Sequence, residues 1–288
     1  MSTEEAKEMN TKHIKLTAIL SLLIAISLPT TAVYAMTGNY QPDNTHSFTG
    51  LIVFYTTDDI GNKIPVSMGS GILLSPTIVL TAAHTCVTES AIVCFDKGPI
   101  VFSVKDNHLQ VEGVTSTYEG IAYQNPDYNI NVAGKKGLPE FLHGDLAIII
   151  LNEPVPSSVV NTYAQLPTAG LVDTLPDKID VTLVGYGLPK ISNSPASGLI
   201  MRNSASAKTI SGNFAWSDEF LRCSANPSQG KGGISFGDSG GPVLLGQTNI
   251  VLALNSYVTN SNCAGVTYHS RLDIPEVLNW IAEVSLHD

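Results

Sequence analysis

Three short segments of the chain carry side chains that together could perform nucleophilic catalysis. His84 follows Thr-Ala-Ala, Asp145 precedes an apolar run at residues 146–151, and Ser239 lies within Gly-Asp-Ser-Gly-Gly-Pro. A serine hydroxyl is a weak nucleophile, so it needs an imidazole to accept its proton and a carboxylate to orient that imidazole. The glycines around the serine permit a tight turn and leave N–H groups free to bind a developing oxyanion. This combination of residue types favours acyl-transfer chemistry.

Each of these residues also has an ordinary structural explanation. A single histidine after two alanines is usually a hydrogen-bonded structural residue, and an aspartate at the start of a strand usually caps a turn. The hexapeptide around Ser239 arises rarely by chance, and His84, Asp145 and Ser239 follow one another with their contexts intact. The joint pattern therefore favours a catalytic site over three unrelated structural positions.

Most of the chain has the pattern of short β-strands. β-Branched and apolar runs, separated by turn residues, predict strands at residues 51–55, 71–74, 78–81, 91–95, 100–104, 146–151, 181–184, 204–210, 242–245 and 250–255. A stretch rich in Pro, Ser and Thr at residues 152–178 separates two runs of strands. One helix, which Asp273 would cap and Pro275 would begin, closes the chain. The pattern predicts an all-β fold of two barrels or sandwiches with a C-terminal α-helix.

The composition excludes two broad classes of protein. The 288 residues include 43% hydrophobic and only 14% charged residues, so the chain has enough apolar surface to fold and is not intrinsically disordered. The formal net charge is −10. A nucleic-acid-binding protein needs a basic face to displace counterions from phosphates, so we expect no nucleic-acid partner.

The N-terminal residues have the pattern of a secretory signal peptide. A basic lead precedes an apolar run at residues 16–28, and the small residues Val33 and Ala35 stand at positions −3 and −1 of a cleavage point. The alternative, a membrane anchor, would need about 20 apolar residues. We therefore expect residues 1–35 to be removed and the protein to be secreted (extracellular or periplasmic), without a stable membrane anchor. Residues 36–48 would then form an N-terminal extension or a short propeptide.

All four cysteines, Cys86, Cys94, Cys223 and Cys263, lie in the part of the chain expected to be exported. An even number of cysteines in an oxidising compartment favours two disulfides, and free buried thiols are the alternative. Of the three possible connectivities, proximity favours Cys86–Cys94, which leaves Cys223–Cys263. No cysteine or histidine spacing is typical of a metal site.

The three motifs resemble those of the trypsin/chymotrypsin family of serine endopeptidases, over roughly residues 49–284. The resemblance implies a chymotrypsin-like fold of two six-stranded antiparallel β-barrels with a C-terminal helix. The peptidase domain would occupy residues 49–288. Its barrels would lie at about 49–160 and 170–270, and its helix at about 274–285.

The resemblance also implies a role for each site residue. His84 would act as general base and then general acid, Asp145 would orient and stabilise its cation, and Ser239 would attack the peptide carbonyl to form an acyl-enzyme. The N–H groups of Gly237 and Ser239 would form the oxyanion hole. Such an enzyme needs no cofactor or metal, acts on peptides or proteins, and is expected to be a monomer.

Several positions depart from the family pattern. Cys86 is displaced by one position, Gly69-Ser70-Gly71 stands where its usual partner would lie, and Ser235 replaces a cysteine four residues before the nucleophile. No Ile-Val-Gly-Gly segment precedes the first strand. The family uses the freed N-terminus of that segment to pair with the acid before the nucleophile, here Asp238. A buried Asp238 therefore needs another partner, or activation needs another cut between residues 36 and 49.

The resemblance also indicates a substrate preference. Ser256, Tyr257 and Val258 are similar to the strand that pairs with the substrate backbone. Gly233 stands six residues before Ser239, where trypsin-like members have an aspartate, so we expect no preference for Lys or Arg. Val258 replaces a glycine that lines the pocket, which should narrow it. The prediction is cleavage after small or medium uncharged residues.

Two other functions are compatible with parts of the sequence. The string around Ser239 also fits the Gly-x-Ser-x-Gly motif of α/β-hydrolases, but that fold needs its acid, its base and several βα units after the serine. Residues 240–288 are too few for them. A non-catalytic protease-like binding module is the second alternative, although such proteins usually have a replaced triad residue.

Overall fold

The computed structural model describes residues 36–105, 108–132, 141–188, 197–210, 219–258, 263 and 265–286, which belong to one structural unit, Val33–Asp288. The expected signal peptide at residues 1–35 lies outside the described residues. Within the described ranges, no helix is long and apolar enough to cross a membrane.

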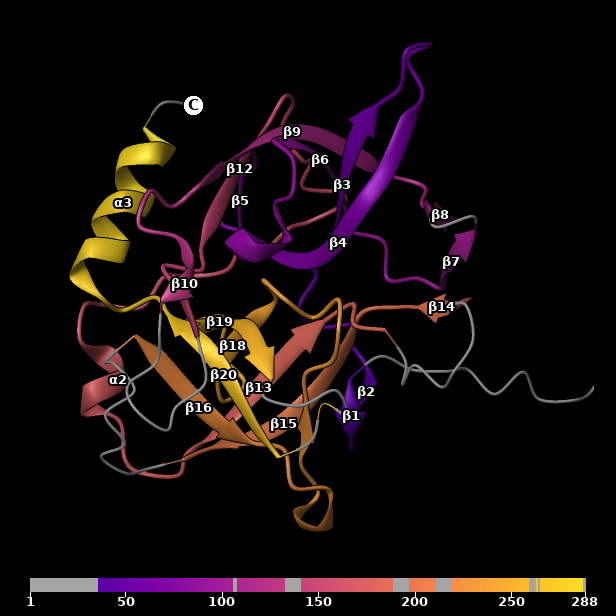
Figure 1. Cartoon of the computed structure of the whole chain (residues 1–288). Coiled ribbons are helices and arrows are strands. Elements are labelled where there is room, and N and C mark those ends of the chain that lie inside the picture. Colours follow the sequence, from indigo (N-terminus) through magenta and orange to yellow (C-terminus); the bar gives the residue numbers. More distant parts are fainter. Residues whose placement is uncertain are drawn as a thin grey trace, which may run out of the picture. The chain divides into compact units, whose positions relative to one another are not determined.

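The first barrel is built from the N-terminal half of the described chain (Figure 1). Its six strands are β3 (Thr49–Thr57), β4 (Lys63–Leu73), β5 (Ile78–Thr81), β6 (Ser90–Cys94), β9 (Thr117–Gln124) and β12 (Ala147–Leu151). They pair in the order β12-β5-β4-β3-β6-β9, and the antiparallel pairing of β12 with β9 closes the ring. Apolar and β-branched side chains fill it, with Ile52, Leu80 and Ile148 fully buried.

The second barrel is built from the C-terminal half. Its six strands are β13 (Asp180–Gly185), β15 (Asn203–Thr209), β16 (Phe220–Ser224), β18 (Pro242–Leu245), β19 (Val251–Val258) and β20 (Val266–Arg271). They follow the order β13-β18-β19-β20-β16-β15, and the antiparallel pairing of β13 with β15 closes this ring as well. The predicted fold class, an all-β chain with two six-stranded antiparallel barrels and a C-terminal helix, is confirmed.

The C-terminal helix α3 (Pro275–Ser285) packs against the first barrel (Figure 1). Ile281 is buried in the same hydrophobic cluster as the strand residues Ile148 and Leu80. The predicted cap was wrong, because Ile274 occupies the N-cap position and no side chain caps the helix. Asp273 is instead fully buried and accepts hydrogen bonds from the amide of Val172 and the guanidinium of Arg271.

Smaller elements lie outside the two barrels. They include a three-stranded sheet of β14 (Ser197–Ile200), β7 (Ile100–Lys105) and β8 (His108–Glu112), the pair β10 (Asn129–Val132) and β11 (Phe141–His143), the helix α2 (Leu171–Thr174), and the 3₁₀ turns η1 (Ala83–Thr85) and η2 (Pro227–Gln229). Only η1 contributes directly to the site described below.

Neither predicted disulfide is present, because all four cysteines are free and buried. Cys86 packs in the hydrophobic cluster of the first barrel, whereas Cys94 belongs to a separate cluster with Tyr186 and Ile200. Cys223 faces the core of the second barrel, in a cluster that does not include Cys263. The predictions of Cys86–Cys94 and Cys223–Cys263 are therefore wrong for this structure.

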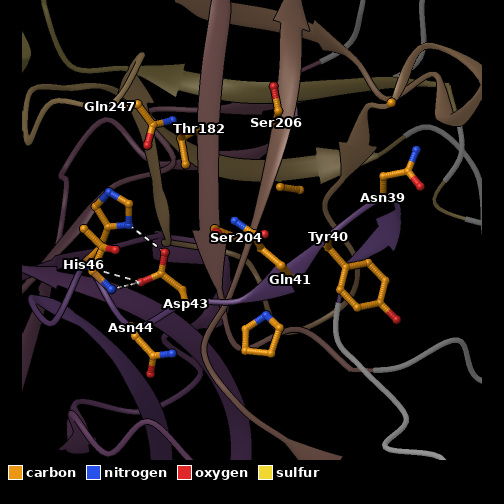
Figure 2. A pocket seen from close by; sticks show the side chains of 14 residues that line it. Asn39, Tyr40, Gln41, Asp43, Asn44, His46, Thr182, Ser204, Ser206 and Gln247 are labelled. Atoms are coloured by element: carbon orange, nitrogen blue, oxygen red, sulfur yellow. Dashed lines mark hydrogen bonds and ion pairs between the residues drawn. The ribbon is translucent and has the colours of Figure 1, made fainter.

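The segment at residues 36–48 is attached to the second barrel. Its strand β1 (Thr37–Gly38) pairs with β17 (Gly232–Gly233), and its strand β2 (Gln41–Pro42) pairs with β15. Met36 is buried in the core cluster of that barrel. Figure 2 shows the buried pair that follows β2, in which the Asp43 carboxylate accepts hydrogen bonds from the amide and the ring of His46.

Candidate active site

The strand register brings His84 and Asp145 to the same edge of the first barrel. Neighbouring strands β5 and β12 pair with Ala147 opposite Thr81, and His84 follows the end of β5 in η1 while Asp145 precedes the start of β12. Two residues that lie just beyond the paired ends of adjacent antiparallel strands are close in space. Ser239 precedes β18 of the second barrel, in a turn in which Gly237 and Gly240 have positive φ.

The structure brings the three predicted side chains into hydrogen-bond contact. His84 Nδ1 lies 2.9 Å from Asp145 Oδ2 and 3.1 Å from Oδ1, and His84 Nε2 lies 2.9 Å from Ser239 Oγ. The backbone amide of His84 also donates to Asp145 Oδ1, at 2.9 Å. With Nδ1 donating to the carboxylate, Nε2 is left as the acceptor for the serine proton.

Ser256 also contacts this trio, as we call His84, Asp145 and Ser239. The sequence did not indicate this contact. Its side-chain hydroxyl donates a short hydrogen bond to Asp145 Oδ2, and its carbonyl lies 3.5 Å from Ser239 Oγ. Asp145 is fully buried and thus accepts bonds from the His84 ring, the His84 amide and the Ser256 hydroxyl. A serine in a strand is too common to be recognised from sequence as the partner of a distant carboxylate.

The charges of His84 and Asp145 stabilise each other. Burial of the imidazole lowers the pKa of His84, but the Asp145 carboxylate raises it by more, so that this pKa lies above 6.5. Burial raises the pKa of Asp145, whereas the His84 cation and the hydrogen bonds from His84 and Ser256 hold it below 3.8. The carboxylate therefore stays ionised at neutral pH, next to an imidazole that can be protonated.

We expect activity to be lost as the pH falls through a midpoint above 6.5. A protonated His84 cannot accept the serine proton, and Asp145 favours the protonated form, so the acid limb lies higher than for a free imidazole. The measurement is kcat/KM against pH, with an uncharged peptide substrate. A profile that stays flat down to about pH 4 would show that another group is the base.

The carbonyl groups of the turn before Ser239 are held by hydrogen bonds. The Phe236 carbonyl accepts a hydrogen bond from the Leu188 amide, and the Asp238 carbonyl accepts bonds from the Gly241 amide and the Asn255 side chain. In a planar trans peptide the N–H points opposite to the C=O, so the amides of Gly237 and Ser239 face the other way. Neither amide has a hydrogen-bond acceptor among the described residues. The two predicted oxyanion donors therefore have no protein acceptor within the described ranges.

Comparison with known proteins identifies the family of the chain. A family model described as Trypsin matches residues 41–281, which is more than half of the sequence. This chain belongs to the trypsin family. Two solved structures share its fold at 18% sequence identity: HL collagenase (TM-score 0.58, 87% of this chain and 98% of that chain covered) and GrC (TM-score 0.56, 87% and 99% covered). No curated protein sequence matches the chain significantly.

Asp238, which precedes the nucleophile position of this trypsin-family chain, is held by backbone amides. Its carboxylate accepts hydrogen bonds from the amide of Gly187, at 2.7 Å, and from the amide of Ser235, at 2.8 Å. Within the described part of the chain, no cation lies at ion-pair distance. A Cβ atom at Gly187 or Gly185 would lie only 2.3 or 2.4 Å from the carboxylate oxygens, so these glycines allow the close approach.

The burial of Asp238 has an electrostatic cost. Burial raises the pKa of its carboxyl to about 7, although the bonds from Ser235 and Gly187 lower it. The folded state therefore favours the neutral acid, and this group reduces the stability of the fold as the pH rises from about 4 to about 7. The two amide hydrogen bonds therefore stabilise the ionised Asp238 carboxylate less than a cationic partner would.

Of the four predicted substrate-binding residues, Ser256 lies next to Ser239, with its carbonyl 3.5 Å from Ser239 Oγ. Ser256, Tyr257 and Val258 form the end of β19, where Tyr257 and Val258 pair with β20 and with no described strand on the other edge. An extended peptide could add to such a free edge. Gly233 lies in β17, and a Cβ atom there would come within 2.5 Å of the Ala225 methyl group.

A separate polar cavity of about 330 Å³ lies beside β2 and β15 (Figure 2). Its lining includes Asp43, Ser204 and Gln247 but none of the three residues of the trio, so it is distinct from the candidate active site. Among the residues that the structure describes, no group of three or more His, Cys, Asp or Glu is arranged to hold a metal ion.

Proposed function

We propose that the protein is a secreted serine endopeptidase that hydrolyses peptide bonds through His84, Asp145 and Ser239. The observation that carries this proposal is the pair of contacts of His84, with Nε2 at 2.9 Å from Ser239 Oγ and Nδ1 at 2.9 Å from Asp145 Oδ2. These are the contacts that a serine nucleophile, its base and the carboxylate that orients the base require. Membership of the trypsin family supports the same reaction.

The reaction has two halves. As Ser239 Oγ attacks the peptide carbonyl, its proton passes to His84 Nε2, and the oxyanion that forms accepts hydrogen bonds from the amides of Gly237 and Ser239. Collapse of this intermediate breaks the C–N bond, with the His84 proton going to the leaving amine, and leaves an acyl-enzyme on Ser239. A water molecule, deprotonated by His84, then attacks the ester, and the proton returns to Ser239 as the acid product leaves.

The alternative proposal is a non-catalytic protease-like binding module. Such a module does not need the hydrogen bonds that join the trio. It also does not need two amides, those of Gly237 and Ser239, that have no acceptor in the described part of the chain. The contacts of His84 therefore favour the enzyme. The leader pattern at residues 1–35 supports secretion. We also propose that the substrate is a peptide or protein and that the enzyme acts as a monomer.

We expect cleavage after small or medium uncharged residues. Gly233 offers no carboxylate to a basic side chain, and Val258 adds bulk where the family often has glycine. The measurement is the cleavage of a peptide library by the purified protein, with the residue before each cut identified by mass spectrometry. A dominant preference for Arg or Lys before the cut site would contradict the assignment of these two residues.

A further inference from the structure

We propose that Ser70 is a positioning residue that holds the oxyanion loop, residues 236–239, in the geometry that hydrolysis requires. Ser70 lies in β4 of the first barrel and is fully buried. Its hydroxyl donates to the Gly237 carbonyl, at 2.8 Å, and its backbone amide donates to the Ser239 carbonyl, at 2.7 Å. This inference rests on the proposed function and concerns how the chain builds that site.

Every carbonyl of the loop has a donor, and Ser70 supplies two of the four. The Phe236 carbonyl is bound by the Leu188 amide, and the Asp238 carbonyl by the Gly241 amide and the Asn255 side chain. The remaining two carbonyls, those of Gly237 and Ser239, are bound by Ser70. The Phe236 and Asp238 carbonyls set the directions of the Gly237 and Ser239 N–H groups, because each carbonyl shares a peptide plane with the next N–H. The two bonds from Ser70 hold the peptide planes that directly follow Gly237 and Ser239, and so restrain both donor residues from the other side.

The Ser70 hydroxyl is itself held in place. It accepts a hydrogen bond from the Tyr186 amide, at 2.9 Å, while the Ser70 carbonyl accepts one from Thr81 Oγ1, at 2.7 Å. The hydroxyl thus has one donor and one acceptor partner at nearly ideal distances. It links β4 of the first barrel to two segments of the second barrel that are distant in sequence.

The main chain next to the oxyanion loop packs directly against β4, with no room for a side chain at position 240. A Cβ atom at Gly240 would lie 2.3 Å from the Ser70 carbonyl oxygen, and Gly240 has a φ of +83°. An alanine at position 70 would leave the buried Tyr186 amide and the partly buried Gly237 carbonyl without this partner. Polar groups that lose their partners turn toward new ones, and a rotation of the peptide plane between residues 237 and 238 would shift the adjoining planes, which carry the N–H groups of Gly237 and Ser239.

We expect Ser70→Ala to lower kcat by about 10–100-fold, less than the loss of a whole oxyanion donor, and to leave KM nearly unchanged. The rate at which a fluorophosphonate labels Ser239 should fall in parallel, because that reaction also develops negative charge in the oxyanion hole. Ser70→Cys, which keeps a weak donor at this position, should recover part of both rates. It also provides the same test if the alanine variant does not fold.

Thr182→Val is the matched control. The Thr182 hydroxyl is also buried, donates to a glycine carbonyl, that of Gly246, at 2.7 Å, and accepts a bond from Gln247. This hydroxyl lies away from the trio, so Thr182→Val should lower the unfolding temperature without changing kcat.

The outcomes separate the two proposals. If native protein neither cleaves peptides nor labels at Ser239, the proposed function fails. If native protein is active and Ser70→Ala retains its full kcat, the role of Ser70 is overturned. An equal loss of kcat in the Ser70→Ala and Thr182→Val variants would also overturn it, because the effect would then follow stability alone.

Discussion

Ser239→Ala is expected to lower kcat by about 10⁶-fold while leaving the fold intact. Among the residues that the structure describes, the alanine removes the one nucleophile in contact with His84 Nε2, and the methyl group fits where the serine side chain was. A residual rate of about 10³–10⁴ over water is expected to remain, because the oxyanion donors and substrate binding are untouched. The measurement is peptide turnover under saturating substrate, with the unfolding temperature as a control for the fold. A variant with near-native turnover would mean that another group is the nucleophile.

Asp145→Asn is expected to lower kcat by roughly 10⁴-fold, the size of effect expected for the family's triad. The Asp145 carboxylate accepts from the His84 amide through Oδ1 and from the His84 ring and the Ser256 hydroxyl mainly through Oδ2. An asparagine that keeps its oxygen toward the amide turns its NH₂ group toward the ring. Nδ1 would then accept a bond, the ring proton would move to Nε2, and His84 could no longer accept the serine proton.

The chain offers a closely matched control for Asp145→Asn. Asp43 and His46 form a second buried aspartate–histidine pair, in which Oδ1 also accepts from the histidine amide, at 2.8 Å, and Oδ2 contacts Nδ1, at 2.7 Å. In the described part of the chain, no serine, threonine or cysteine side chain hydrogen-bonds to either the carboxylate or the ring of this pair. Asp43→Asn should therefore lower the unfolding temperature but change kcat by less than about threefold, as expected away from the reacting groups. Near-native kcat in the Asp145→Asn variant would show that Asp145 is the wrong acid.

The sequence could predict which three side chains meet because each of them lies in a short local motif. Each of His84, Asp145 and Ser239 carries a short motif, and each lies just beyond the end of a strand whose apolar pattern is readable. The order of the strands around each barrel could not be derived from these patterns. The resemblance to a family supplied the two six-stranded barrels, without the order of their strands.

Two of the strands that the sequence did not predict, β20 and β9, have atypical patterns. In β20, the polar residues Thr267, His269 and Ser270 are buried, so the buried positions are not marked by apolar side chains. β9 is interrupted by a glycine, Gly120, whose missing side chain leaves room for the main chain of β12. Hydrophobic periodicity identifies a strand only where the buried side chains are apolar.

Contacts between residues far apart in the chain were beyond sequence reasoning. The hydrogen bonds of Ser70 with Gly237 and of Ser256 with Asp145 each join residues more than 100 positions apart. The cysteine pairing failed for a related reason, since Cys86 and Cys94 are near in sequence but pack in different hydrophobic clusters. Proximity along a chain of strands does not show which face each side chain occupies.

The most direct test of the central claim is active-site labelling of the folded, processed protein with a fluorophosphonate. We expect one phosphonyl group per chain, located on Ser239 by mass spectrometry, with peptidase activity lost in proportion to the labelling. The Ser239→Ala variant should not be labelled. Labelling should also slow as the pH falls through the pKa of His84. Folded native protein that cleaves no peptide and is not labelled at Ser239 would contradict the account and favour the non-catalytic binding module.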